Sequence, residues 1–176
     1  MHEVLEAHEG REEDPLTLPV AVTLSILAVL VAIATLLGHR GSTEELMLQT
    51  KASDQWALFQ AKNIRLHEMQ SFADVLGTLA PVDKEKAEAL RERYLREAER
   101  YEKEKDEAAE HAKELEKERE LVSRRTDRYE AGEVILEIAL IICSLTLLTK
   151  KRFFWVSGIA LGLVGVCVAL SGFLIR

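Results

Sequence analysis

The stretch LTLPVAVTLSILAVLVAIATLL, residues 16–37, decides the fold, because it contains no aspartate, glutamate, lysine or arginine. A second uncharged stretch, FFWVSGIALGLVGVCVALSGFLI, occupies residues 153–175. An α-helix rises about 1.5 Å per residue, so each stretch is long enough to cross a hydrocarbon layer about 30 Å thick. The sequence therefore predicts an all-α membrane protein rather than one soluble domain.

Three transmembrane helices are predicted from the apolar segments. The first covers residues 15–38, the second residues 131–149 and the third residues 153–175. The segment before the first helix, residues 1–14, is an acidic tail, whereas a cleavable signal peptide begins with a basic region. We therefore expect the first helix to be retained in the membrane.

A break is predicted directly after the first transmembrane helix. Gly38 and Gly41 are residues of the type that ends helices. Ser42 and Glu45 follow with the spacing of a capping box, which is typical of a new helix.

Residues 42–130 are predicted to form a soluble antiparallel helical hairpin. Mixed charges at helical spacing and a scarcity of glycine, proline and serine favour two helices, about 43–79 and 83–130, over a disordered charged spacer. Pro81 and Asp83 mark the turn between them. The second helix has a four-three, coiled-coil-like rhythm that predicts a packing seam. Its members are Tyr94, Ala98, Tyr101, Lys105, Ala108, Ala112, Leu115, Arg119, Val122, Thr126 and Tyr129.

Two rows of side chains with the same rhythm run along the first hairpin helix. One interpretation of the polar row is recognition of a partner or control of oligomer register, because a buried amide penalises wrong pairings. The alternative is a polar flank in contact with water. The amide-rich row consists of Gln49, Ser53, Trp56, Gln60, Asn63, His67 and Gln70, and the apolar row of Leu48, Ala52, Phe59, Leu66, Met69, Ala73 and Leu76.

Stripes of small residues occur in the first and third transmembrane helices. Small side chains let two helix backbones approach closely. Such stripes pack either against each other within one chain or between subunits, and the sequence leaves both arrangements open. The first stripe is Ala21, Ser25, Ala28 and Ala32, and the third-helix stripe is Gly158, Gly162, Gly165, Ala169 and Gly172.

Two carboxylates, Glu133 and Glu137, lie in the second transmembrane segment. Charges inside a membrane are costly and often functional, so Glu137 is a candidate proton or cation site. The alternative, which we favour, is a structural carboxylate paired across helices with His39, Arg40 or Arg176.

The composition argues against several classes of function. The net charge is −7, and we recognise no basic patch beyond Lys150, Lys151 and Arg152, so no nucleic-acid partner is expected. No catalytic motif is found, so no enzyme is predicted. We predict no cofactor and no metal site, and we interpret His2 and His8 as part of a solvated tail.

The orientation in the membrane is predicted from the basic turn at residues 150–152. Lysine and arginine in short loops favour the cytoplasm, which places the amino terminus inside and the hairpin outside. His39 and Arg40, taken alone, favour the reverse.

The segment Lys51-Ala-Ser-Asp-Gln-Trp56, followed by Gln60-Ala-Lys62-Asn-Ile-Arg65, resembles the signature of a bacterial membrane-protein family, domain of unknown function 4337. The resemblance also covers the preceding span, the Pro81-Val-Asp83 turn, the charged helix and the basic turn before an aromatic-rich span. It implies a three-pass protein of the bacterial inner membrane with no assigned activity. Members of the family often carry a tail richer in histidine than this one.

Together these observations lead us to expect a non-enzymatic homo-oligomer of the bacterial inner membrane whose hairpin serves as a scaffold. Its expected partners are membrane lipids, further copies of the chain and an unidentified protein. The alternative is a small channel or transporter component, in which Glu137 and the amide-rich row line a path.

Overall fold

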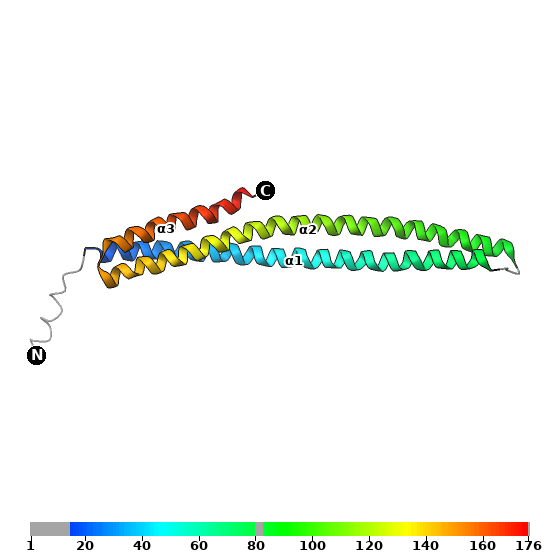
Figure 1. Ribbon diagram of the computed structural model, residues 1–176, viewed down its shortest axis with the longest axis horizontal. Coiled ribbons are helices and arrows are strands. Elements are labelled where there is room, and N and C mark those ends of the chain that lie inside the picture. Colours follow the sequence, from blue (N-terminus) through cyan, green and yellow to red (C-terminus); the bar gives the residue numbers. More distant parts are fainter. Residues whose placement is uncertain (1–14, 80–82, 176) are drawn as a thin grey trace, which may run out of the picture. The chain divides into compact units, whose positions relative to one another are not determined.

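The structure is a computed structural model that describes residues 15–79 and 83–175. Within these residues the chain forms α1 (Thr17–Thr78), α2 (Lys84–Thr149), α3 (Arg152–Ser171) and the short 3-10 helix η2 (Gly172–Leu174) (Figure 1). No strand occurs in this part of the chain, which confirms the prediction of an all-helical protein. The predicted acidic tail, residues 1–14, lies outside the described residues.

Each of the three α-helices contains a segment that is long and apolar enough to cross a membrane. In α1 this segment lies near the amino terminus. The sequence likewise predicts three apolar segments, of which the first and third carry no charged residue.

The predicted break after the first apolar segment does not form, because α1 continues through Gly38 and Gly41. The Ser42 hydroxyl donates to the Gly38 carbonyl at 3.0 Å within this helix instead of starting a new one. A Cβ added at Gly41 would lie 2.1 Å from Thr126 Oγ1 of α2. Glycine here lets a neighbouring helix approach closely, and that packing outweighs a propensity cost of about 1 kcal/mol.

The chain divides into two compact units. We call residues 15–42 together with 123–175 the apolar unit and residues 43–122 the charged unit. All three α-helices contribute to the apolar unit, and α1 and α2 contribute to the charged unit.

The core of the apolar unit is built from α1 and α2 and is closed by α3. Partly buried side chains that pack against this core include Trp155 of α3, whose indole Nε1 donates to Thr23 Oγ1 at 3.0 Å. Both cysteines are free. The buried core residues are Leu27, Ala34, Leu136, Ala139 and Cys143.

The charged unit has a small apolar cluster of Leu48 and Ala52 from α1 with Leu115 and Val122 from α2. Residues further along α1 contact residues earlier in α2. Lys62 forms an ion pair with Glu104. The rings of Phe72 and Tyr94 have centroids 5.5 Å apart.

Asp83, which marks the predicted turn, caps the start of α2. The backbone amide of Lys86 donates to Asp83 Oδ1 at 3.1 Å. This hydrogen bond and the Lys86 side chain lower the pKa of the Asp83 carboxyl from its ordinary value. A carboxylate at this position also interacts favourably with the helix dipole.

Candidate functional site

The predicted seam of α2 is the face that the chain buries. Lys105 and Arg119 interrupt it, yet each is only partly exposed and has an acidic neighbour. The Lys105 ammonium lies 3.5 Å from Asp106, and the Arg119 guanidinium lies 3.9 Å from Glu45 of α1. The buried members are Ala98, Ala108, Ala112, Leu115, Val122, Thr126 and Tyr129. The small alanines among them allow α2 to pack closely on its neighbour.

The amide-rich row lies beside the packing face of α1, not within it. Leu48, Ala52, Leu66 and Ala73 of the apolar row are buried. Two members of the amide-rich row are half-buried, Trp56 and Asn63, and five are exposed, Gln49, Ser53, Gln60, His67 and Gln70. The row therefore borders the α1–α2 contact of the charged unit and presents most of its amides outward.

Trp56 is held by contacts inside the charged unit. Its indole Nε1 donates to Glu116 Oε1 of α2 at 2.8 Å. Its ring meets that of Phe59 edge-on, with centroids 5.5 Å apart. Trp56 thus helps to attach α1 to α2, which is a structural role beside any role in recognition.

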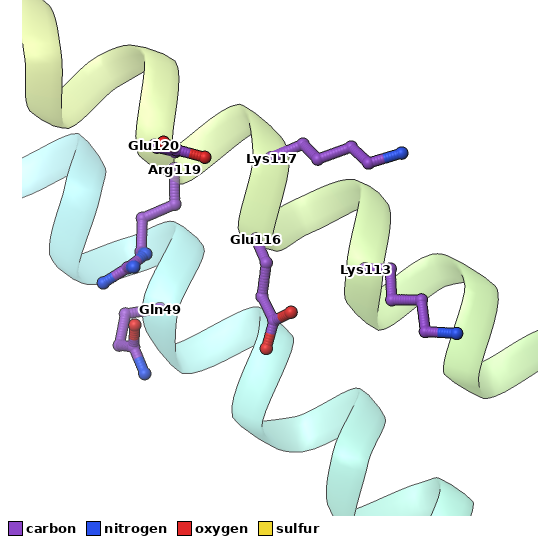
Figure 2. A pocket seen from close by; sticks show the side chains of 6 residues that line it. All are labelled: Gln49, Lys113, Glu116, Lys117, Arg119 and Glu120. Carbon is purple, nitrogen blue, oxygen red and sulfur yellow. The ribbon is translucent and has the colours of Figure 1, made fainter.

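An open cleft of about 590 Å³ is lined by Gln49 of the amide-rich row and by residues of α2. In Figure 2 the Arg119 side chain extends toward α1, where Gln49 lies, while Lys113 and Lys117 extend away from it. Three basic and two acidic side chains share the cleft with the amide, so its lining has no strong charge of one sign. Its residues are Gln49, Lys113, Glu116, Lys117, Arg119 and Glu120.

The third-helix stripe packs against α2, which corrects the arrangement in which the two stripes pack on each other. A Cβ added at Gly165 would lie 2.9 Å from Leu136 Cγ, and one at Gly172 would lie 2.8 Å from Tyr129 Cε1. Gly158 faces Cys143 in the same way. The other members are the buried Gly162, which faces Leu27 of α1 and Ala139 of α2, and Ala169, which faces Gly132 of α2.

The first stripe remains uncovered by the chain. Its four members, Ala21, Ser25, Ala28 and Ala32, are all exposed. Instead, α1 uses Val20, Leu27 and Ala34 as its buried face, and these positions repeat every seven residues. The two stripes of similar composition thus have different environments, one inside the chain and one on its surface.

The two carboxylates of the second apolar segment, Glu133 and Glu137, also differ. Glu133 is half-buried and accepts a hydrogen bond from Thr35 Oγ1 of α1 at 2.5 Å. Glu137 is exposed and forms no hydrogen bond or ion pair with any residue in 15–79 or 83–175. The expected pairing of Glu137 with His39 or Arg40 is therefore not found, because the Glu137 side chain lies on the outer surface of α2. The third expected partner, Arg176, lies outside the described residues.

The basic turn joins α2 to α3 through a residue in the left-handed conformation. Lys150 has a φ of 53°. Its backbone amide donates to the Thr146 carbonyl at 2.8 Å, which closes the end of α2. Lys150, Lys151 and Arg152 are all exposed.

A second group of basic residues, which the sequence analysis missed, lies at the opposite end of α3. Arg125 Nε donates to the carbonyl of Ile175 at 2.9 Å. Arg124 and Arg128 line a cleft that Ile175 also lines. The sequence does contain three arginines within five positions, but the many acidic residues of the charged segment conceal this cluster in the net charge of the segment.

No group of three or more histidine, cysteine, aspartate or glutamate side chains suited to a metal ion occurs among the described residues. His2 and His8 lie outside those residues.

Comparison with known proteins identifies one family. The family described as Domain of unknown function (DUF4337) matches residues 16–175. No curated protein and no solved structure matches the chain.

Proposed function

Since the chain belongs to the DUF4337 family, whose description assigns no activity, we propose a function from its architecture. The protein is a non-enzymatic homo-oligomer of the bacterial inner membrane with three transmembrane helices. Its charged unit is an antiparallel hairpin that projects from the bilayer as a scaffold.

The lengths of α1 and α2 support the proposal that part of each helix lies outside the membrane. α1 has 62 residues and α2 has 66. At about 1.5 Å per residue each measures roughly 90–100 Å, whereas the hydrocarbon layer is about 30 Å thick. The charged two-thirds of each helix therefore belongs in water.

An antiparallel hairpin is supported by the order of contacts in the charged unit. Glu45, early in this part of α1, is close to Arg119, late in this part of α2. Phe72, near the end of α1, stacks beside Tyr94, near the start of α2. Such pairing follows when a short turn joins two neighbouring helices.

The uncovered small-residue stripe of α1 is the observation that carries the proposal of a homo-oligomer. Ala28 and the other stripe members form a track of small side chains beside the exposed Val22, Ile26 and Val29. A track of this kind permits close approach of a second helix, which is how helices associate in lipid. A second copy of α1 presents the same track, as the self-complementary contact of a twofold dimer requires.

The test compares one substitution at two positions. Ala28→Leu fills the track, whereas Ala160→Leu makes the same change at an exposed site of α3 outside the third-helix stripe. We expect mass measurement in nanodiscs to show an oligomer for the unaltered protein and for Ala160→Leu, and smaller species for Ala28→Leu. A monomeric unaltered protein would refute the proposal.

For the orientation we propose a cytoplasmic amino terminus and an external hairpin, because the exposed turn at residues 150–152 is a short basic loop. Arg124, Arg125 and Arg128 favour the reverse, but they belong to a long segment whose translocation depends little on charge. Protease added to spheroplasts should therefore cut within residues 43–122. Protection of this segment, together with labelling of a cysteine at Lys151 from outside, would reverse the orientation.

A channel or transporter component is the second candidate, and the exposure of Glu137 favours it. A carboxylate on the surface of an apolar helix is costly unless a second subunit or water covers it. In this case Glu137→Gln changes ion flux into liposomes and leaves oligomer size unchanged. Flux that is absent in the unaltered oligomer supports the scaffold instead.

A further inference from the structure

A cleft of about 400 Å³ lies where the carboxyl-terminal end of α3 and η2 meets α2. Arg125 and Tyr129 of α2 fix this meeting point. Arg125 Nε donates to the Ile175 carbonyl at 2.9 Å, and the Tyr129 ring packs edge-on against Phe173 at 5.5 Å. The end of the third apolar segment therefore lies beside residues 125–129 of α2.

The lining of the cleft combines arginine with apolar side chains. Arg124 and Arg128 are four residues apart, so they lie on the same face of α2. Ala131 and Ile175 supply the apolar part of the lining, and Asp127 supplies one acidic group. With Arg125 beside it, the site carries three guanidinium groups against one carboxylate.

Guanidinium groups beside the end of an apolar segment are suited to binding phosphate. Arginine binds a phosphate through two parallel hydrogen bonds, and basic pockets beside transmembrane helices bind anionic lipid headgroups. One turn further along α2, Val134 is 54% exposed, and Leu174 of η2 is 83% exposed. The arginines thus adjoin apolar surface of the kind that acyl chains cover.

We infer that this cleft binds the phosphate of an anionic phospholipid, with Arg124 and Arg128 as its ligands. The inference rests on the proposed insertion of the apolar unit in a membrane. A free phosphate ion would use the arginines alone, whereas a lipid also uses Ala131, Ile175 and the apolar surface below them. The apolar part of the lining is the reason to assign the lipid.

The experiment measures lipid binding to the full chain in a mild detergent. The probes are phosphatidylglycerol, phosphatidylcholine and inorganic phosphate, and the readouts are lipid retention in native mass spectrometry and the apparent Kd. The variant Arg124→Gln/Arg128→Gln removes two charges from the cleft. The control, Lys113→Gln/Lys117→Gln, removes two exposed charges with the same four-residue spacing from the charged unit.

We expect the unaltered chain and the lysine control to retain phosphatidylglycerol in preference to phosphatidylcholine. The double arginine variant should bind phosphatidylglycerol roughly 10- to 30-fold more weakly, since each basic group near anionic lipid contributes a factor of about five. The variant Arg124→Lys/Arg128→Lys keeps the charge and loses the paired hydrogen bonds, so it should fall between them.

Three results would overturn the inference. They are equal binding of both lipids, no effect of the arginine changes on lipid binding, or binding of inorganic phosphate alone with the same apparent Kd as phosphatidylglycerol. If Arg124→Gln/Arg128→Gln loses helicity, Arg124→Lys/Arg128→Lys tests the inference in its place. This variant must still bind phosphatidylglycerol more weakly than the unaltered chain does. Membrane insertion is tested separately by washing vesicles with carbonate. If the apolar unit does not insert, the wash releases every variant, including the unaltered chain.

Discussion

Replacing Gly132 with alanine tests how closely α2 and α3 pack. A Cβ at this position would lie 2.7 Å from Ala169 Cβ, and 2.9 Å from both the Ala169 nitrogen and the Gly165 carbonyl oxygen. Two of these three atoms belong to the backbone of α3, so no side-chain rotation relieves the contact. The helices must separate instead.

The net effect follows from two opposing contributions. Overpacking against a rigid neighbour costs up to about 3 kcal/mol, and alanine gains about 1 kcal/mol over glycine inside a helix. Gly132→Ala should therefore lower the free energy of unfolding by about 2 kcal/mol. For a chain of this length the thermal midpoint should fall by about 4–8 °C.

Gly38→Ala is the matched control, because it makes the same change inside α1. Its added Cβ would meet only Glu130 Cγ at 3.5 Å and Glu133 Oε2 at 3.9 Å, which are ordinary contacts with flexible side chains. Only the helix-propensity gain of up to about 1 kcal/mol remains, so the midpoint should rise by about 2–4 °C. Thermal unfolding in detergent, followed by circular dichroism, measures both. Equal stability of the two variants would refute the close approach of α2 and α3.

Three further predictions concern single contacts. Cysteines at Leu48 and Val122, which share one apolar cluster, should crosslink within one chain on a gel, whereas a pair at positions 48 and 90 should not. Hydrogen bonding to Lys62 lowers the pKa of Glu104 from its ordinary value of 4.5, so this stabilisation is present above pH 4.5 and is lost as the pH falls through the lowered pKa. Glu104→Gln should therefore reduce the loss of thermal stability in acid, and an unchanged pH profile would contradict this. Glu137→Gln should leave the unfolding free energy of the monomer in denaturant within about 0.5 kcal/mol, because no described residue pairs with it, and a larger loss would reveal a partner.

Regular periodicity made much of the helical structure predictable. The seam of α2 repeats with a four-three spacing, and burial falls on those positions, as at Ala98, Ala112 and Leu115. Lack of charge likewise located the first and third apolar segments, and a high apolar content located the second. Both signals are local along the chain, so one sequence contains them in full.

The features that were missed depend on which helices become neighbours. Gly38 and Gly41 have the local character of a helix end, yet Thr126 of α2 occupies the space beside Gly41 and the helix continues. The third-helix stripe contained no sign that its partner is α2 rather than the first stripe. Tertiary contacts of this kind override local propensity and are not written in residue spacing.

The hydrogen bond from Thr35 to Glu133 joins residues that are 98 positions apart. At a synthesis rate of about 5–20 residues per second, α1 therefore waits roughly 5–20 s before its own partner in α2 has been made. By contrast, Cys143 and Trp155, on opposite sides of the basic turn, are separated by 12 positions and meet almost as soon as they are translated. If copies of the chain associate as proposed, nascent chains on neighbouring ribosomes have an interval in which their first helices are free to meet before α2 encloses either one, and pairing between copies would then precede the folding of each copy.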